Sequence, residues 1–453
     1  MLKDTRLYQL VEPITKALED NRQADIRPFL DGLSSAEIAR LIDAMPKETR
    51  QLVWPYVSTE QVGEVLLSTH KKLRHELARS TQESILVESL GHIQVDELAD
   101  LDDDLPAEVL NAMSMVMGEQ QRQRYETVKD YPDNSAGGLM NIDAATVRAD
   151  VTLKSVQRYY RRLRVREEGL PEHLDSLMVV DRCHHLVGIL PLITLVSADQ
   201  NAVVDTVMQK VPSSFTPLQS DADVARVFAD RDLLSAPVVD EDNHLIGRIT
   251  VDDIIDVMRN QADKELLGRA GLDKSELMFG PLLPSSLRRA LWLGVNLLTA
   301  FMAAWVIGLF EASIEKLVAL AILMPVVASM AGIAGSQTLT VVTRGIALDQ
   351  IGRGNFVKLL YHEISIGLIN GVFWALLVSL VVYLWFGSWK LGIVFGASLL
   401  IGILTGAISG AIFPIALKRM KIDPALAGGV LLTTATDMIG LFCFLGSATL
   451  ILL

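Results

Sequence analysis

The sequence predicts a multi-domain protein with a cytosolic all-α superhelical N-domain, an α/β pair of repeated modules, a connecting helix and a five-helix transmembrane domain. Three observations predict this fold class. Five long apolar segments follow residue 280, a strand–turn–strand pattern occurs twice in the middle of the chain, and helix-start signals recur near the N-terminus. Half of the 453 residues are hydrophobic, which suits a protein with one domain in a membrane.

The charge of the chain is distributed unevenly along its length. The whole sequence has 54 acidic and 41 basic side chains, of which six and ten follow residue 280, so the first 280 residues hold 48 acids and 31 bases and a net charge of −17. This excess of acid argues against nucleic-acid binding and suits cation binding. The N-terminus lacks the apolar core of a signal peptide, which predicts that the acidic part stays in the cytoplasm. Two cysteines, Cys183 and Cys443, are too few for a disulfide framework.

Residues 1–130 are predicted to form the helical N-domain. Apolar residues recur three and four positions apart, and two helix starts, Ser34 with Glu37 and Ser58 with Gln61, have the spacing of a capping box. These starts lie 24 residues apart, which indicates stacked helical hairpins. Near the end of the domain six acids crowd nine residues, a pattern that taken alone indicates a solvated helix face. The six are Asp96, Glu97, Asp100, Asp102, Asp103 and Asp104.

A duplicated segment occupies the middle of the chain. Residues 179–188 and 238–247 share an apolar strand, a polar turn and a second strand, and they lie 59 residues apart. The pattern predicts two copies of one α/β module packed together. It resembles a tandem CBS pair, a regulatory module that often senses nucleotides, with the first domain at 131–198 and the second at 199–258.

The resemblance to CBS domains also implies where a nucleotide would bind. Thr250 and Asp253 occupy the positions that hold ribose in nucleotide-binding members. In the first copy Leu190 and Ile193 stand there instead. At most one nucleotide site is therefore expected, with ATP as its ligand.

Two adjacent histidines, His184 and His185, lie in the first polar turn. Adjacent residues on a strand or turn point apart, and we expect no acid or cysteine to join the pair at ligand spacing. The pair is therefore predicted to be turn histidines and not a metal site.

A charged helix is predicted from Val251 to about Leu277, and residues 259–280 of this region connect the repeated modules to the membrane part. The helix is too polar to span a bilayer. It either transmits a domain movement to the membrane part or is an inert linker, and its position in the chain is compatible with both.

The transmembrane domain, residues 281–453, contains five segments near or above the roughly 20 residues that a spanning helix needs. Bases cluster before the first segment, between the second and third, and between the fourth and fifth. The positive-inside rule then predicts a multi-pass protein with the N-terminal domains in the cytoplasm and Leu453 outside. We expect the membrane to be a bacterial-type inner membrane. The segments cover residues 287–310, 317–343, 361–386, 391–416 and 425–452.

The fifth segment carries a carboxylate, Asp437, near its middle. A lone acid at mid-membrane costs about 2.5 to 3.5 kcal/mol and is expected to face a partner or water. Thr433, Thr434 and Thr436 lie beside it and the segment has no basic residue, so a cation is the natural counter-charge. Two copies of this acid in a symmetric dimer suit hydrated Mg²⁺, which one or two carboxylates usually hold, better than Ca²⁺ or Zn²⁺.

The second segment is rich in small side chains and hydroxyls over residues 324–345. Gly332 and Ser336 contribute to a face without bulk, and Pro325 removes one helical hydrogen bond. Tight helix packing would explain the small residues alone. Together with the acid in the fifth segment, they indicate a pore wall that leaves room for a hydrated ion.

These features resemble the MgtE family of magnesium transporters and channels over nearly the whole chain. The order of the domains agrees, as do the segments 131–140, 324–345 and 423–441. The resemblance implies a homodimer with a pore on its two-fold axis, Mg²⁺ uptake through the bilayer, and closure of the pore by cytosolic Mg²⁺ through the connecting helix. It places the transported ion at Asp437, Thr433, Thr434, Ser336 and Gly332. It places regulatory Mg²⁺ at Asp253, Asp256, Glu265, Asp230, Asp100 and Asp104.

Two departures from the family pattern stand out. Gln261 and Lys264 replace acids that family members often carry in the connecting helix, so closure is expected to need more Mg²⁺ or to be less complete. Ser336 and Ile333 replace polar residues near the selectivity acid, which leaves selectivity over Co²⁺ and Mn²⁺ open.

Two other functions compete with this one. His362 and Glu363 begin a string like that of zinc peptidases, but Ile366 stands where the second zinc ligand would be, so we predict that the protein is not an enzyme. The remaining alternative is a CBS-regulated transporter of Co²⁺ or Mn²⁺. The candidate pore residues include no histidine or cysteine, which disfavours these softer ions.

Overall fold

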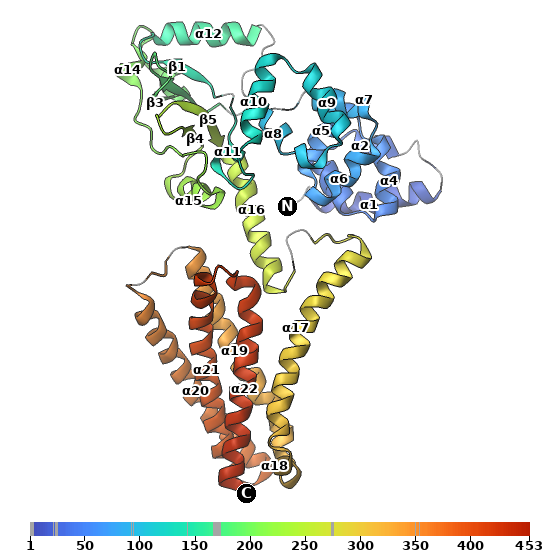
Figure 1. The fold of residues 1–453 in the computed structure, drawn as a ribbon, viewed down its shortest axis with the longest axis vertical. Helices are drawn as coiled ribbons and strands as arrows, with labels where there is room; N and C mark the ends of the chain where they lie inside the picture. The colour runs from blue at the N-terminus through green and yellow to red at the C-terminus, as the bar shows by residue number, and fades with distance from the viewer. Residues whose placement is uncertain are drawn as a thin grey trace. The chain divides into compact units, whose positions relative to one another are not determined.

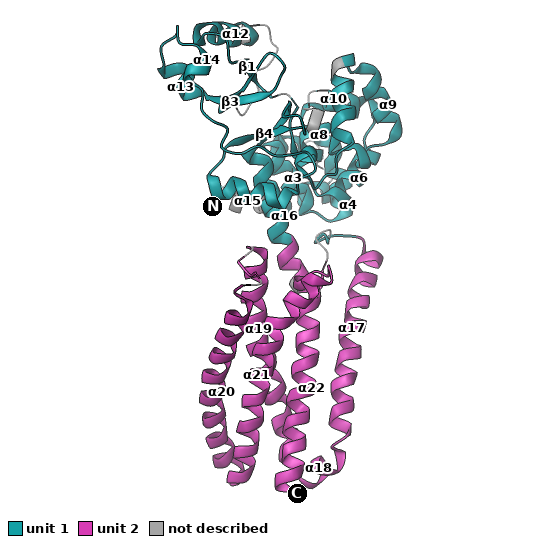
Figure 2. Ribbon diagram, turned by 60° about the vertical axis from the view of Figure 1, so that its left-hand side comes forward, with its two compact units in different colours: residues 1–263, 275–280 teal, residues 264–274, 281–453 magenta. Residues whose placement is uncertain are grey.

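The protein forms two compact units (Figure 2), the first covering residues 1–263 and 275–280 and the second residues 264–274 and 281–453. The structure is a computed structural model. It describes residues 4–20, 22, 26–91, 93, 95–142, 144–165, 174–272, 276–348, 350–352 and 354–453. The side chain of Asp96, and Arg353 in one of the predicted basic clusters, lie outside the described residues.

The N-terminal part of the first unit is a stack of short helices (Figure 1), as the sequence predicts. Its core is continuous from α1 to α9, and residues predicted to face inward, such as Ile38 and Met45, are fully buried. The helices are α1 (Asp4–Glu19), α2 (Ile26–Leu30), α3 (Ser35–Asp43), α4 (Lys47–Val53), η2 (Trp54–Tyr56), α5 (Thr59–Ser68), α6 (Lys71–Ser80), α7 (Glu83–Leu90), α8 (Val95–Ala99), η3 (Asp102–Asp104), α9 (Ala107–Val116) and α10 (Glu119–Lys129).

The two predicted helix starts are both present, but only one is a full capping box. Ser34 precedes α3, and its backbone N–H donates to the carboxylate of Glu37 while the Glu37 N–H donates back to the Ser34 hydroxyl. Ser58 precedes α5, yet its hydroxyl donates to the side-chain oxygen of Gln61 at 2.8 Å. In this second pair the two side chains bond to each other, and neither bonds to a backbone N–H group at the start of α5.

The middle of the chain folds into two similar α/β modules. In the first, β1 lies parallel to β2 and β2 pairs antiparallel with β3; in the second, β4 pairs antiparallel with β5. Val179 faces Gly188 and Val238 faces Gly247, each followed by the same irregularity of register. Pro191 faces Ser176 as Thr250 faces Ser235. The expectation of Leu190 and Ile193 is therefore wrong by one position: Pro191 and Thr194 are the equivalents of Thr250 and Asp253. The elements are α11 (Ala136–Leu139), β1 (Thr146–Arg148), α12 (Leu153–Val165), β2 (Ser176–Val180), β3 (Leu186–Pro191), α13 (Leu192–Ser197), α14 (Val204–Val207), α15 (Asp221–Arg231), β4 (Ser235–Val239), β5 (Leu245–Thr250) and α16 (Val251–Arg269).

The two modules contact each other through equivalent residues. His185 forms an isolated bridge with His244, which lies 59 positions later at the same place in the second hairpin. The backbone N–H of Leu186 donates to Asn243 at 3.0 Å, and that of Leu245 donates to His184 at 3.3 Å. Because each contact has a counterpart with the copies exchanged, the pair has a local two-fold relation, which confirms that the repeat is structural.

Each module borrows a segment from outside its own repeat. Ala136 and Met140 lie in the core of the second module with Phe215 and Ile254, whereas Val204 lies in the core of the first. The segment that precedes the first module therefore packs in the core of the second, and a segment that follows the first module's hairpin packs in the core of the first.

Helix α16 ends earlier than the sequence predicts. It stops at Arg269 and not at Leu277, because Gly271 adopts a left-handed φ of 71° that terminates the helix. The N–H groups of Gly271 and Leu272 then donate to Gly268 and Leu267, as expected at a glycine-ended helix. Residues 273–275, which the predicted helix included, lie outside the described residues.

The second unit contains five helices long and apolar enough to cross a membrane, which confirms the five predicted segments. α21 is the central helix: it packs against α19, α20 and α22, and most of its apolar stretch is buried. α17 packs mainly against α22 (Figure 2). The helices are α17 (Leu282–Gly308), the short α18 (Glu311–Lys316), α19 (Ala319–Ala347), α20 (Phe356–Phe386), α21 (Trp389–Arg419) and α22 (Pro424–Leu452). α19 continues through Pro325 near its start.

The small residues of α19 serve helix packing on one side of the helix. A Cβ added at Gly406 of α21 would lie 2.5 Å from the carbonyl oxygen of Ala331 and 2.9 Å from the backbone nitrogen of Gly335. Ala331 and Gly335 are buried in this contact, whereas Ser336 is exposed. The packing explanation therefore holds for one face of α19, and a second face remains uncovered.

Candidate functional site

The carboxylate of Asp437 lies on a face of α22 that the chain itself covers only in part. Asp437 is half-buried, and Thr433, one helical turn earlier, is exposed. Residues one position earlier pack against the other helices instead. This buried stripe consists of Gly428, Leu432, Thr436 and Gly440. Helical geometry thus separates the packed stripe from the face that carries the acid.

Asp437 has no protein partner among the described residues, since no hydrogen bond or ion pair reaches its carboxylate. The neighbouring threonines are satisfied within the helix: the hydroxyls of Thr433 and Thr434 donate to the carbonyls of Gly429 and Val430 at 3.0 and 2.7 Å. Their hydroxyl oxygens keep free lone pairs that can accept from the waters of a hydrated cation.

α19 runs antiparallel beside α22, and glycine contacts establish their register. Gly335 lies against Leu432 and Gly440 lies against Val327, which places Asp437 level with Met330. At 1.5 Å per residue, Gly332 and Ser336 follow about 3 and 9 Å further along the axis. Gly332 has open space where a Cβ would be, and Ser336 is exposed. The structure therefore brings the two predicted pore helices together.

Glu363 is a second carboxylate within the five long membrane helices, besides Asp437, and it is assigned no role in ion binding from the sequence. Glu363 on α20 is only 7% exposed, and the hydroxyl of Thr338 on α19 donates to its Oε2 at 2.8 Å. The sequence does contain a signal for such a contact: an acid within an apolar segment is rare and usually has a polar partner. From the sequence, Glu363 is considered only as part of a peptidase-like string. That string gives no indication that Glu363 contacts α19 from α20.

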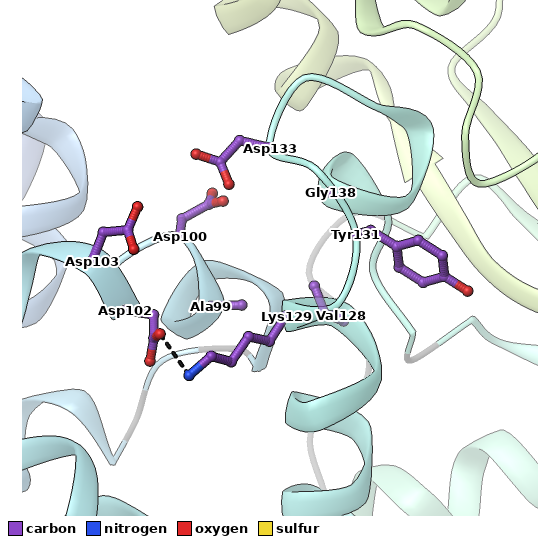
Figure 3. Close-up of a pocket in the computed structure, with 9 residues that line it drawn as sticks. All are labelled: Ala99, Asp100, Asp102, Asp103, Val128, Lys129, Tyr131, Asp133 and Gly138. Carbon is purple, nitrogen blue, oxygen red and sulfur yellow. Dashed lines mark ion pairs between the residues drawn. The ribbon is translucent and has the colours of Figure 1, made fainter.

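Acids of the first unit gather around a hollow of about 120 Å³ (Figure 3). Asp133 reaches toward Asp100 across it, and Asp102 and Asp103 line the same space. Two lysines reduce the negative charge: Lys129 pairs with Asp102 at 2.7 Å, and Lys71 lies 3.4 Å from Asp103 and 3.5 Å from Asp133. The solvated face expected for these acids agrees with the exposure of Glu97, Asp100 and Asp103 but not with Asp104, which is buried. The other lining residues are Ala99, Val128, Tyr131 and Gly138.

Asp100 is the acid of this group whose charge is least favourable. Desolvation raises its pKa to about 6, opposed by Arg74 and reinforced by Asp133 and Glu97. Asp104 differs, because it is buried and the guanidinium of Arg74 lies 3.7 Å from its carboxylate. Desolvation raises the pKa of Asp104 despite that cation. Among the described residues Asp100 therefore makes no ion pair and is only partly compensated by Arg74, whereas Asp104 pairs with Arg74 directly.

Asp253 at the start of α16 is coupled to Asp100. The hydroxyl of Thr250 donates to its carboxylate at 2.9 Å, and the Thr250 N–H does so at 3.4 Å. Desolvation, then the charge of Asp252 and to the smallest extent that of Asp100 together raise the pKa of Asp253 to about 6, against the hydrogen bonds from Thr250, which lower it. Two predicted regulatory acids, far apart in the sequence, thus lie close enough within the first unit to repel.

The other predicted regulatory acids are not gathered into this cluster. Asp230 and Asp256 are exposed, and Glu265 lies in the second unit. Within the described part of the chain, none of the three makes an ion pair or a side-chain hydrogen bond.

Lys264 has a partner that the sequence did not reveal. Its ammonium lies 3.8 Å from the carboxylate of Asp423, and both residues belong to the second unit. Asp423 also caps α22 by accepting from the N–H of Ala425 at 2.9 Å. The last turns of α16 are therefore tied to the first turn of α22.

The prediction that no acid or cysteine accompanies His184 and His185 is wrong. The hairpin turn brings ligand atoms of Asp181, Cys183 and His185 within 4.8 Å of one another. These three residues lie two positions apart, and side chains at that spacing point to the same side of a hairpin. His184 between them adopts a left-handed backbone conformation with φ 68°.

Comparison with known proteins identifies the domains. The family model for divalent cation transporters of the MgtE type matches residues 324–447, that for the MgtE intracellular N domain matches 33–134, and that for the CBS domain matches 204–260. The solved cytosolic domain of the Mg²⁺ channel MgtE in complex with ATP is 27% identical, covers 55% of this chain and 99% of its own, and has a TM-score of 0.48.

Whole-chain relatives agree with these matches. The magnesium transporter MgtE of Bacillus subtilis is 28% identical over 449 residues, 99% of each chain. The magnesium transporter MgtE of Enterococcus faecalis is 30% identical over 320 residues, 71% of this chain and 70% of its own. The chain therefore belongs to the MgtE family, a family of transporters and not of enzymes.

Proposed function

We propose that the protein is a magnesium-selective transporter or channel that mediates Mg²⁺ uptake and is gated by cytosolic Mg²⁺. The observation that carries the proposal is the carboxylate of Asp437, which lies on a partly covered face of a membrane helix and has no cationic partner in the described part of the chain. An acid in this place costs about 2.5 to 3.5 kcal/mol unless water or a cation meets it.

A second copy of the chain completes the site in this proposal. Two carboxylates facing each other across a two-fold axis hold Mg²⁺ through its own waters, because this ion sheds them reluctantly. The exposed hydroxyls of Thr433 and Ser336 contribute acceptors along the path. A homodimer with its pore on the axis removes the acid from lipid without a basic residue.

Gating rests on the acids of the first unit. Desolvation is the main cause of the raised pKa of both Asp100 and Asp253, and repulsion by the charge of Asp100 adds to that of Asp253. A divalent ion between them would relieve this repulsion and favour the arrangement that brings them together. Asp256, Asp230 and Glu265 have no internal partner among the described residues and are the further ligands of this proposal. Asp104 contributes less, since Arg74 already compensates its charge.

The orientation follows from the distribution of bases. Arg288 and Arg289 lie near the N-terminal end of α17, the first span, and Lys418, Arg419 and Lys421 precede the last. The positive-inside rule places these ends, and with them the acidic N-terminal domains, in the cytoplasm of a bacterial-type inner membrane. Leu453 then lies outside.

ATP at the CBS pair is a separate part of the proposal. Thr250 and Asp253 are hydrogen-bonded to each other at the start of α16, so ribose hydroxyls would have to take over one of these bonds. A nucleotide that contacts Asp253 would therefore be linked to the same acid as regulatory Mg²⁺.

The test is Mg²⁺ flux into liposomes that contain the full-length protein. Asp437→Asn is expected to abolish flux, because the amide has no charge to attract the ion. Thr436→Val is the matched control: Thr436 adjoins the acid but is fully buried on the packed stripe. Equal flux in wild type and Asp437→Asn would remove the acid from the pore. Faster Co²⁺ or Mn²⁺ flux at equal gradients, unblocked by Mg²⁺, would establish the transition-metal alternative instead.

A further inference from the structure

We propose that the first CBS hairpin holds a zinc-class divalent ion through Asp181, Cys183 and His185, at a site separate from the transport path. One ligand atom from each side chain lies within 4.8 Å of the other two. Carboxylate, thiolate and imidazole together form a donor set that favours Zn²⁺ over Mg²⁺, because Mg²⁺ prefers oxygen ligands and water.

The turn holds Asp181 and His185, the first and last of the proposed ligands, in position before an ion binds. Asp181 Oδ1 accepts from the backbone N–H groups of Cys183 at 2.8 Å and His185 at 2.9 Å, which fixes the loop around the carboxylate. The other oxygen, Oδ2, lies 3.0 Å from Nδ1 of His185. Two donors held about 2.1 Å from a tetrahedral zinc ion lie about 3.4 Å apart, so the ion can replace the shared proton with little movement.

The second module supports the imidazole. The ring of His244 stacks on that of His185 with centroids 4.5 Å apart and planes 25° apart, which limits rotation of the ligand ring. His244 is itself oriented by Asp240, whose Oδ2 lies 3.2 Å from its Nδ1. Supporting contacts of this kind orient metal-binding histidines in proteins.

The charges around the site are compatible with a cation. The carboxylate of Asp181 supplies a negative charge to the site, and its Oδ2 lies 3.0 Å from Nδ1 of His185. The neighbouring guanidinium of Arg182 is bonded to Asp150 at 3.0 Å. On binding, the Cys183 thiol gives its proton to solvent and the neutral imidazole carries its proton on Nε2, so the ion meets two negative ligands and one neutral ligand.

The second hairpin is an internal comparison. Asp240 Oδ1 accepts from the N–H groups of Asp242 and His244 at 3.0 and 2.8 Å, the same bonds that organise the first hairpin. A carboxylate, Asp242, stands where the first hairpin has its thiol. The two turns thus share a scaffold and differ in the one ligand that selects a soft ion, which assigns the site to the first hairpin.

The test is a Co²⁺ titration of the full-length protein in detergent, with excess Mg²⁺ present to occupy the carboxylate sites. The wild type is expected to bind one Co²⁺ per chain with a thiolate-to-cobalt charge-transfer band that Zn²⁺ removes. Cys183→Ser should lose the band, and His185→Ala should weaken binding by about tenfold or more.

Three variants serve as matched controls. Cys443→Ser removes the other thiol, Asp242→Asn changes the second hairpin, and His184→Asn installs the residue that holds the same left-handed turn there, Asn243 with φ 65°. All three are expected to retain the band and the affinity. A wild type without the band, or Cys183→Ser with it, overturns the proposal, and neither result bears on Mg²⁺ flux.

Discussion

The hydroxyl of Thr338 on α19 donates a 2.8 Å hydrogen bond to the carboxylate of Glu363 on α20, and both side chains are buried. These two helices otherwise touch little, since α21 packs against both. The bond therefore connects the proposed pore wall to a helix that has few other contacts with it. A buried carboxylate deprived of such a donor is costly, so the pair should be energetically coupled.

Truncating either member of this pair should destabilise the membrane unit. We expect Glu363→Ala and Thr338→Val each to cost about 1 to 3 kcal/mol, because each leaves a buried polar partner unsatisfied. The double variant should cost less than the sum by about 0.5 kcal/mol or more. Thermal unfolding in detergent measures the cycle. Additive effects would show that the bond contributes nothing, and Glu363→Gln, which keeps an acceptor, should be the mildest change.

The close contact between α19 and α21 should not tolerate a methyl group at Gly406. Its Cβ would lie 2.5 Å from the Ala331 carbonyl oxygen. This oxygen belongs to the backbone, so it cannot move away by a change of rotamer as a side chain could. We expect Gly406→Ala to lower stability by about 1 to 3 kcal/mol through separation of the helices. Gly294→Ala on α17 is the control, since nothing lies within 4 Å of its added Cβ. Equal melting temperatures for the two variants would contradict the packing described here.

Mg²⁺ protection of the first unit should weaken as the pH falls below about 6. The raised pKa values of Asp100 and Asp253 mean that both carboxyls take up protons near that pH, and protons then compete with Mg²⁺. Limited proteolysis at pH 7.5 and 5.5, with and without Mg²⁺, measures this.

Without Mg²⁺, the pH has the opposite effect on the stability of the first unit. A group whose pKa is raised by folding binds protons more tightly in the folded state, so its stabilising effect is present below its unfolded pKa and is lost as the pH rises through about 6. The metal-free first unit should therefore become more resistant to proteolysis from pH 7 toward pH 5. Asp100→Asn with Asp253→Asn should flatten both trends, and an unchanged pH profile in that variant would exclude these acids.

Replacing Lys264 should change the sensitivity of gating to Mg²⁺. The ammonium already sits 3.8 Å from Asp423, where a divalent ion would otherwise be attracted. The ion pair is exposed and contributes only about 0 to 1 kcal/mol, so its loss should not unfold the unit. Lys264→Glu creates two facing carboxylates, and liposome flux should then close at lower cytosolic Mg²⁺. Lys264→Glu with Asp423→Lys restores the opposite charges and should return closure to the wild-type range; closure unchanged in the single variant would count against the idea.

Several features follow from contiguous stretches of sequence. Five apolar segments are long enough to span a membrane because length and hydropathy are properties of neighbouring residues, and all five are helices. The 59-residue repeat predicts two similar hairpins, and Val179 and Val238 occupy matching registers in them. Ser34 with Glu37 closes its capping box within four residues of chain.

Other features depend on packing between distant parts of the chain. Glu363 meets Thr338 across 25 residues, His185 stacks on His244 across 59, and Asp100 acts on Asp253 from another helix. Sequence periodicity states which face of an element is apolar, but not which element covers that face or which polar atoms meet there. Only the folded chain decides those distances, because hydrogen bonds and charge interactions act over a few ångströms, and tertiary packing sets the separation of residues that lie far apart in sequence.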